Sequence, residues 1–400
     1  MLKLLFWASI GLVVYVYLGY PVLVDLLSRL RKAARDSCRG LPELPRVTVI
    51  IPAHNEERWI ARKIENTLAL NYPRNRVQIL IGSDGSSDST VGTARQFVSE
   101  GVEVAHFAER AGKCITINRL LPKARGDIIL FTDANALLEP DVLQRMLPHF
   151  TDPQVGCVTG NRTCAATDSP ATDGEGLYWR YENWIRRSES QIDSCLGGYG
   201  QILAARRPLV RQIPGASDDF HVPMQILVST GKRVVFEPHA IARIPAAATL
   251  GQELERKIRS HVSLFHDSYY LRDGLKPWKS TVWWQFWSHH VLRLFVPYAL
   301  LMALLSSAFL WRAAALYRVI TIGQCVFYMA AATGYLLTHW GIRMRIVYIP
   351  FYFVFANLAV FLAWVRWARG KHQYAWQRTE RTMPTAEPAP PLGRSCSAGP

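Results

Sequence analysis

The sequence predicts an α/β fold built around a mostly parallel sheet and flanked by transmembrane helices. Three observations lead to this prediction. Between residues 42 and 278, short apolar runs alternate with helical patterns, as in an α/β domain. Apolar segments long enough to cross a bilayer precede and follow this region. Half of the 400 residues are hydrophobic, a high share for a soluble enzyme but a low one for an all-membrane protein.

The central region divides into strands and helices by its apolar pattern. Short apolar runs predict strands, and the amphipathic segments between them predict helices. Ligands of such folds bind at the carboxyl ends of the parallel strands, so we expect the functional site there. The predicted strands are residues 47–51, 77–81, 102–106 and 128–131, and the predicted helices are residues 56–70, a segment after Asp88, residues 113–121 and a later run over 220–229.

The amino-terminal segment predicts a membrane anchor. Residues 4–27 are apolar apart from Asp25, and a basic cluster begins at Arg29. A cleavable signal peptide is the alternative, but the apolar run is long and no A-x-A-type cleavage site follows it. The basic cluster places the chain that follows in the cytoplasm by the positive-inside rule. We therefore expect a transmembrane helix over residues 1–28 and a cytosolic domain over residues 42–278.

Residues 279–368 predict an interfacial segment and about three transmembrane helices. Four tryptophans between Trp278 and Trp287 suggest an approach along the membrane surface. Three crossings from a cytoplasmic domain would leave the basic residues 366–381 outside, against the positive-inside rule. Either one segment is re-entrant, or a fourth crossing lies near residues 281–296. A basic and then disordered tail is expected over residues 369–400. The candidate crossings are residues 294–311, 319–338 and 346–365.

Charge and cysteine content narrow the class of protein. Lys and Arg number 46 against 31 acidic residues, which gives a formal net charge of +15. Much of this excess lies beside the apolar segments, so membrane flanks explain it better than nucleic acid does. No nucleic-acid-binding module is recognisable, and we expect no such partner. The seven cysteines are scattered without a C-x-x-C pair, which favours reduced thiols in a cytosolic body.

Acidic side chains gather where three of the predicted strands end. Residues 52–57 (P-A-H-N-E-E) follow the first strand, residues 83–88 (S-D-G-S-S-D) the second and residues 132–135 (T-D-A-N) the fourth. A single Asp after a strand is usually a helix cap or a turn residue. Three acidic segments at one sheet edge instead indicate a divalent cation, because hard cations take oxygen ligands. Asp133 and Asn135, two positions apart, are the expected metal ligands.

Four short motifs follow one another along this region. They read P-A-x-N-E, S-D-G-S-x-D, G-K-x-x-x-x-N and G-D-x-x-x-F-T-D-A-N. Their order and spacing resemble the catalytic domain of family-two glycosyltransferases, which include cellulose, hyaluronan and poly-N-acetylglucosamine synthases. The likeness runs from about Val47 to Ser260. It implies a Rossmann-like GT-A domain that transfers a sugar from a nucleotide-sugar with inversion.

The resemblance implies a role for each donor-side residue. Pro52 and Glu56 would border the nucleoside pocket, and Asp84 would bind a uracil-like base. Lys113 would approach the ribose or the diphosphate, although a solvated helix start is the plainer interpretation of this lysine. Asp133 would bind Mg²⁺ or Mn²⁺. The second ligand would be Asn135, where the family usually has Asp and where the amide brings no charge.

The resemblance also implies an acceptor side. Asp219 matches the base that takes the proton of the acceptor hydroxyl, and Asp218 beside it replaces a Glu. The alternative is that the two acidic residues only favour the start of the helix that follows. The loop containing Gly198, Tyr199 and Gly200 would meet the acceptor sugar, with a plain turn as the alternative.

The segment from Arg256 to Ser260 stands where processive synthases have Q-x-x-R-W. Arg259 matches the arginine that would brace the donor diphosphate, although a basic stretch there also suits lipid headgroups. The Trp is replaced by Ser260, which argues against processive synthesis. A later run over residues 376–381 resembles a W-x-x-T-x-R segment of related membrane transferases.

Together these features predict an inverting glycosyltransferase of the cell (inner) membrane. It would be multi-pass, with its catalytic domain in the cytoplasm. The donor would be a nucleotide-sugar, most simply a UDP-sugar, and the acceptor a hydroxyl of a saccharide or glycolipid. Membrane lipids are its other expected partners. Two alternatives stay open: a polyprenyl-phosphate glycosyltransferase, and a non-catalytic subunit of a polysaccharide export complex.

Overall fold

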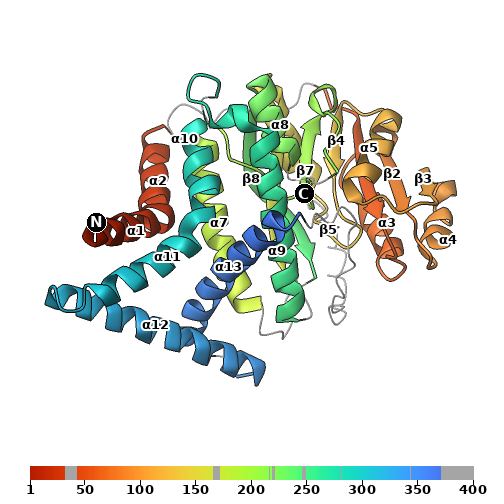
Figure 1. Cartoon of the computed structure of the whole chain (residues 1–400). Helices are drawn as coiled ribbons and strands as arrows, with labels where there is room; N and C mark the ends of the chain where they lie inside the picture. Colours follow the sequence, from red (N-terminus) through yellow and green to blue (C-terminus); the bar gives the residue numbers. More distant parts are fainter. Residues whose placement is uncertain are drawn as a thin grey trace, which may run out of the picture.

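The computed structural model describes residues 1–31, 43–164, 172–215, 217–218, 221–245, 249–280, 282–342 and 344–370. It consists of a sheet domain and an arm of long helices that extends to one side of it (Figure 1). The predicted α/β fold with a mostly parallel sheet is confirmed, and its arm contains the long apolar helices.

One eight-stranded sheet forms the centre of the domain, in the order β3-β2-β1-β4-β7-β6-β8-β5. The first four strands in this order run parallel, β7 is antiparallel to both of its neighbours, β6 and β8 are parallel, and β5 is antiparallel to β8. Every residue of β1 is buried, as expected for a strand covered on both faces. The strands are β1 (Val47–Ala53), β2 (Val77–Asp84), β3 (Val102–Phe107), β4 (Ile128–Phe131), β5 (Leu137–Leu138), β6 (Val155–Cys164), β7 (Leu203–Arg206) and β8 (Arg233–Ile244).

The helices of the domain are mostly short. Three of them, α3, α4 and α5, connect the parallel strands, as in a Rossmann-like fold. The α-helices are α3 (Ile60–Leu68), α4 (Thr90–Arg95), α5 (Lys113–Leu120), α6 (Val142–Met146), α7 (Thr172–Ile192), α8 (His221–Thr230) and α9 (Leu250–Tyr270). Short 3₁₀ turns accompany them at η3 (Arg74–Arg76), η4 (Val98–Glu100), η5 (Leu121–Lys123), η6 (Leu147–Thr151), η7 (Arg207–Leu209) and η8 (Arg272–Leu275).

The predicted helix over residues 56–70 is wrong at its start, because α3 begins only at Ile60. The residues before it bind the loop after β2 instead of continuing a helix. Asn55 has a φ of 53°, in the left-handed region, and its Oδ1 accepts a hydrogen bond from the Ser87 backbone N–H at 2.9 Å. The Glu56 backbone N–H donates to Thr90 Oγ1 at 2.8 Å. Tertiary hydrogen bonds therefore override the helical pattern here.

The arm begins with a helix that continues through a π-helical turn, namely α1 (Leu2–Val14), η1 (Tyr15–Gly19) and α2 (Tyr20–Arg31). Beside it run α10 (Trp283–Gln285), the π-helical η9 (Phe286–Val291) and α11 (Leu292–Phe309). The two rods are antiparallel, because Tyr15 Oη lies 2.7 Å from Ser288 Oγ while Phe6 packs against Leu310. The arm is completed by α12 (Ala315–His339) and α13 (Arg345–Ala368).

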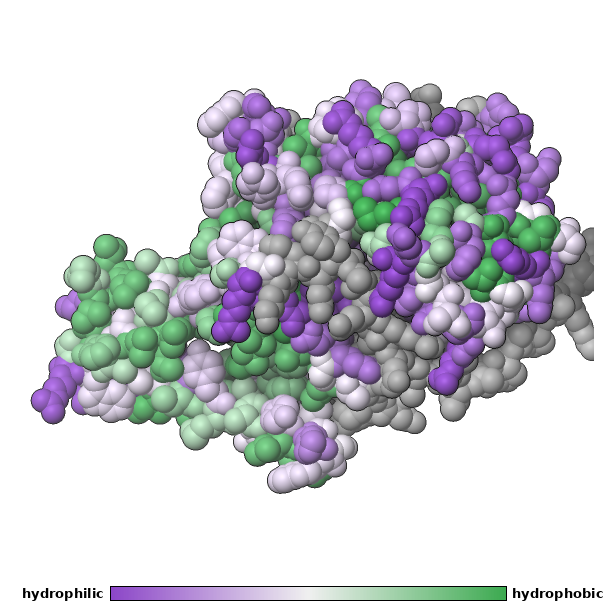
Figure 2. All heavy atoms as spheres, turned by 45° about the vertical axis from the view of Figure 1, so that its right-hand side comes forward, coloured by the Kyte–Doolittle hydropathy of each residue, from purple (hydrophilic) through white to green (hydrophobic). Residues whose placement is uncertain are grey.

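Four helices in the described part of the chain are long and apolar enough to cross a membrane. Hydrophobic residues concentrate over the arm, whereas hydrophilic residues cover most of the sheet domain (Figure 2). The suggested extra crossing near residues 281–296 is not a separate helix, because it continues into the 283–309 span. The four spans cover residues 2–31, 283–309, 315–339 and 346–368.

The last span packs on the sheet domain as well as on the arm. Along α13, Phe351 and Phe355 contact Leu250 and Leu254 of α9, and Ala359 and Ala363 pack with Ile258 and Val262 further along α9. Near the end of α13, the Arg366 guanidinium binds both oxygens of Glu255, at 2.9 and 3.1 Å. The carboxyl end of α13 therefore lies beside the domain.

Candidate active site

Asp84 ends β2, and its side chain is only 2% exposed. Its Oδ1 accepts a hydrogen bond from the Ala111 backbone N–H and its Oδ2 accepts one from Gly112, both at 2.8 Å. Gly112 has a φ of 97°, a conformation that favours glycine, and it precedes α5 directly. The carboxylate thus joins the end of β2 to the start of α5. Each of its oxygens has a second lone pair for a ligand.

Asp133 follows β4 and is held by two long side chains. Lys113 Nζ lies 2.5 Å from its Oδ1, and Gln201 Nε2 donates to its Oδ2 at 2.9 Å. The same ammonium lies 4.0 Å from Oδ1 of Asp218. Lys113 therefore stands between two acidic segments that are distant in sequence. It is not merely a solvated residue at a helix start, since its side chain is mostly buried.

Asp133 and Asn135 lie buried in the loop after β4, where the metal ligands were expected. Among the described residues, no group of three or more His, Cys, Asp or Glu side chains is placed to hold a metal. Mg²⁺ sites in enzymes often use one or two carboxylates and complete the coordination with water and substrate phosphates. The pair therefore fits a metal whose coordination is completed by water and substrate phosphates, and it does not form an all-protein cage.

Arg259 lies on α9 and interacts electrostatically with Asp218. Burial lowers the pKa of the Arg259 guanidinium, and the negative charge of Asp218 opposes that shift. Asp218 is thus influenced by two cations, Lys113 and Arg259. The side chain of Asp218 is 43% exposed, so it remains accessible to a ligand. The predicted base, Asp219, lies outside the described residues.

The segment around Asp218 is fastened on both sides. Cys114 Sγ donates to the Ser217 carbonyl oxygen at 3.0 Å. His221 Nδ1 lies 2.6 Å from Asp267 Oδ1 of α9, and both side chains are buried. Burial raises the pKa of the Asp267 carboxyl, and the hydrogen bond with His221 opposes this rise. The pair was not predicted, because His221 and Asp267 belong to no motif and meet only in the fold.

The residues expected to border the nucleoside lie at the carboxyl end of β1. Pro52 is the sixth residue of the strand and pairs with Gly82 of β2. Glu56 is buried beyond it, with its backbone held by Thr90. His54 connects this region to Asp84, the aspartate expected to bind the base, since its Nδ1 lies 2.6 Å from the Asp84 carbonyl oxygen.

The glycine-rich loop lies before β7, and its residues are buried. A Cβ on Gly198 would lie 2.8 Å from Thr159 Oγ1, so a side chain has no room there. Tyr199 is 4% exposed, and its Oη donates to Asn183 Oδ1 of α7 at 2.9 Å. The guanidinium of Arg186 lies 4.0 Å from the centre of its ring. Burial raises the pKa of Tyr199 to about 12.

These contacts place the Tyr199 ring inside a stack on α7 and not on an open surface. Gly200 is followed by Gln201, the residue that reaches Asp133. The loop is therefore tied to the donor side through its neighbour. Sequence reasoning missed Gln201, and only its position directly after the glycine-rich motif pointed to it.

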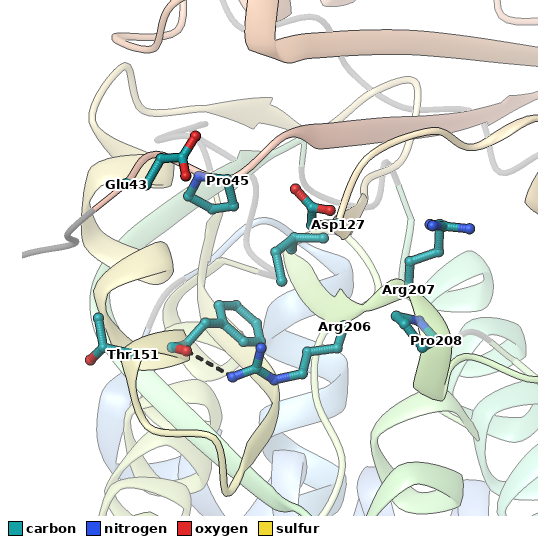
Figure 3. A pocket seen from close by; sticks show the side chains of 9 residues that line it. Glu43, Pro45, Asp127, Thr151, Arg206, Arg207 and Pro208 are labelled. Atoms are coloured by element: carbon teal, nitrogen blue, oxygen red, sulfur yellow. Dashed lines mark hydrogen bonds between the residues drawn. The ribbon is translucent and has the colours of Figure 1, made fainter.

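A cavity of about 450 Å³ lies elsewhere in the sheet domain. It is lined by Glu43, Pro45, Asp127, Arg206 and Arg207, among others (Figure 3). These residues precede β1 and β4 or end β7, so they mark the amino ends of the parallel strands. The acidic residues described above lie at the opposite ends. This cavity is therefore not the predicted site.

A mixed sheet with buried carboxylates at the ends of its parallel strands, next to long apolar helices, is the arrangement expected of a GT-A-type fold. A solved structure has the same fold. The mannosyltransferase PcManGT from Pyrobaculum calidifontis, in complex with GDP-Man and Mn²⁺, matches with a TM-score of 0.68 and 24% identity. The match covers 93% of this chain and 100% of that one, and it establishes the fold alone.

Residues 48–208 match the family Glycosyl transferase family 2, so the chain contains a domain of this family. A β-monoglucosyldiacylglycerol synthase from Trichormus variabilis is 29% identical over 207 residues, 50% of this chain and 43% of that protein. A poly-β-1,6-N-acetyl-D-glucosamine synthase from Staphylococcus aureus is 26% identical over 228 residues, 55% of each chain. The chain thus spans about half the length of these relatives.

Proposed function

We propose that this protein transfers a sugar from a nucleotide-sugar, most simply a UDP-sugar, to a hydroxyl of a glycolipid or saccharide, with inversion. The observation that carries the proposal is the position of Lys113, whose ammonium reaches both Asp133 and Asp218. A donor-side carboxylate and an acceptor-side carboxylate thereby face one point. The two curated relatives are named as synthases of a glycolipid and a polysaccharide, which supports this class of product.

Each group has a task in this proposal. Asp84 accepts a hydrogen bond from the nucleotide base, at the strand end where its carboxylate is held by the backbone N–H groups of Ala111 and Gly112. Lys113 and Arg259 place positive charge beside the diphosphate, where negative charge develops as the leaving group departs. Asp219 accepts the proton of the acceptor hydroxyl as its oxygen attacks the anomeric carbon and the bond to the diphosphate breaks. Asp218 keeps both cations close to this point.

We also propose a divalent cation, Mg²⁺ or Mn²⁺, held by Asp133 and Asn135. When bound, the cation would offset the charge of the donor diphosphate. Asn135 supplies an oxygen without a charge, so the protein contributes a single negative charge to the ion. The mannosyltransferase that shares this fold was solved with Mn²⁺, in agreement with the proposal.

We further propose that the protein lies in the cell (inner) membrane with the sheet domain in the cytoplasm. The basic end of the first span supports this orientation, because Arg29 and Arg31 lie where it joins the domain. In this arrangement α11 leaves the cytoplasmic side and α12 returns. The last helix, α13, then stays along α9, since Arg366 binds Glu255 of the domain. This placement satisfies the positive-inside rule without a fourth carboxyl-terminal crossing.

The proposal is tested by incubating the purified protein in lipid vesicles with a panel of radiolabelled nucleotide-sugars and Mn²⁺. We expect one donor to label a lipid or saccharide product, and Asp84→Asn to reduce labelling strongly. A surface carboxylate, Asp273, provides the matched control as Asp273→Asn, which should leave labelling unchanged. Labelling of a polyprenyl phosphate would support the alternative acceptor. Absence of both donor hydrolysis and transfer across the panel would favour a non-catalytic subunit.

A further inference from the structure

We infer that Lys63 is a positioning residue for the proposed metal site. It holds the loop that carries Asp133 and Asn135 through hydrogen bonds to the residues on either side of that pair. The inference rests on the proposed function. It concerns a residue of α3 that belongs to none of the motifs and touches none of the expected ligands of donor or acceptor.

The geometry around Lys63 is specific. Its side chain is 0% exposed. Nζ donates a hydrogen bond to Thr132 Oγ1 at 2.9 Å and another to the Ala136 carbonyl oxygen at 2.5 Å. These two partners stand immediately before Asp133 and immediately after Asn135. One ammonium therefore clamps both ends of the short loop that carries the two proposed ligands.

Burying a lysine side chain carries a desolvation penalty. Removing an ammonium from water is unfavourable, and an apolar side chain of similar volume would pack at this position without that cost. Burial lowers the pKa of Lys63 to about 7, and the charge of Asp133 opposes this shift. This free-energy cost of burial is explained if the hydrogen bonds from Lys63 hold the loop in the conformation that the metal site needs. Residues that orient metal ligands from behind typically change metal affinity by 10-fold to 100-fold when they are replaced.

The same helix supplies a matched control. Asn66, one turn further along α3, donates from Nδ2 to the Leu138 carbonyl oxygen and accepts from the Leu138 N–H, both at 2.8 Å. It braces β5 and makes no such contact with the two ends of the metal loop. A substitution of Asn66 therefore measures the effect of losing hydrogen bonds of α3 that stabilise the fold without holding the ends of the metal loop.

The test measures Mn²⁺ binding in the presence of UDP, by electron paramagnetic resonance, for the full-length protein in lipid. We expect Lys63→Met to weaken Mn²⁺ binding by about tenfold or more with little change in the thermal midpoint. Asn66→Ala should lower the thermal midpoint and leave Mn²⁺ affinity within about twofold. Equal Mn²⁺ affinity in the wild type and a folded Lys63→Met protein would overturn the inference.

Two further variants keep the test decisive. If Lys63→Met does not fold, Thr132→Val removes one of the two hydrogen bonds and should weaken Mn²⁺ binding several-fold; unchanged affinity in this variant would also overturn the inference. Asp133→Ala separates the two proposals. If Asp133→Ala binds Mn²⁺ as the wild type does, the proposed metal site fails. If it weakens binding while the Lys63 and Thr132 variants do not, only the role of Lys63 fails.

Discussion

The donor side and the acceptor side of the proposed site are built differently. Donor residues stand at the ends of buried parallel strands, and their carboxylates are fixed by short hydrogen bonds, as at Asp84 and Asp133. Acceptor residues come from loops: Asp218 lies partly exposed before α8, and Tyr199 is packed into a stack on α7. A rigid donor side suits a cofactor-like nucleotide shared by many enzymes. An acceptor side assembled from loops can vary without disturbing it.

The largest expected effect is a loss of transfer caused by a substitution on the acceptor side alone. Asp219→Asn should reduce transfer by roughly 10²-fold to 10⁴-fold, because it removes the general base. UDP and Mn²⁺ affinity, measured by calorimetry, should stay within about twofold because the donor groups are untouched. Asp218→Asn is the comparison, and it should weaken UDP binding because Lys113 and Arg259 lose a partner. Substantial turnover in Asp219→Asn would refute the assignment of the base.

The next largest effect is a loss of metal affinity caused by a substitution on the donor side. Asp133→Ala should weaken Mn²⁺ binding by about 10-fold to 100-fold, since it removes the charged ligand. Asn135→Asp should tighten it, because a second carboxylate adds a negative charge to the site. Calorimetric titration of both variants with Mn²⁺ and UDP measures these changes. Unchanged affinity in both would remove the pair from the site.

A smaller effect is expected in the glycine-rich loop. Gly198→Ala places a methyl group 2.8 Å from Thr159 Oγ1 and 2.9 Å from Leu203 Cδ1, so the loop has to move. Transfer to the acceptor should fall by about tenfold, while donor hydrolysis changes little. Gly92→Ala is the matched control, because a Cβ there meets nothing within 4 Å. Equal loss of transfer and hydrolysis would show that the loop serves the donor as well.

Product length gives a further comparison. Ser260 is exposed, and its hydroxyl donates to the Arg256 carbonyl oxygen of its own helix at 3.1 Å. It offers no aromatic face on which a growing chain could stack, so we expect one or a few sugars to be added in each encounter. Size analysis of products at low enzyme and excess donor measures this. Long polymer beside unused acceptor would contradict it.

The smallest effect is a pH dependence of stability from the donor side. Because the pKa of folded Lys63 is about 7 and its ordinary value is 10.5, the unfolded chain holds more protons between these pH values. Stability should therefore rise with pH across that window. Thermal midpoints at several pH values should show a rise of roughly a few °C that is absent in Lys63→Met and retained in Asn66→Ala. Parallel curves for all three proteins would exclude the effect.

The sequence predicted the donor half of the fold well, because its strands are buried on both faces. The run over residues 128–131 matches β4, and the predicted ends of the first three strands fall within three residues of the observed ones. The strands of the other half were not predicted. β7 has only four residues, and β8 places charged residues such as Arg233 and Glu237 among apolar ones.

Site residues that belong to a sequence motif could be predicted. Residues that reach the site only through tertiary contacts could not. Asp84 and Asp133 stand at strand ends, as expected. Gln201 reaches Asp133 from 68 positions away, and Lys63 looks like any lysine on an amphipathic helix. In the arm, His289 and Arg293 interrupt the apolar pattern, which hid the continuous helix from 283 to 309. The structure places them against Glu182 and Glu189 of α7.

The contact between α9 and α13 has a consequence for any measurement on this protein. Ile258 packs on α13, and its neighbour Arg259 is influenced by Asp218 in the proposed site. Lipid that displaces α13 against α9 would therefore shift a cation beside the proposed donor site. The lipid around α13 would then act as a kinetic variable in its own right, and we expect rates measured in detergent to differ from those measured in a bilayer.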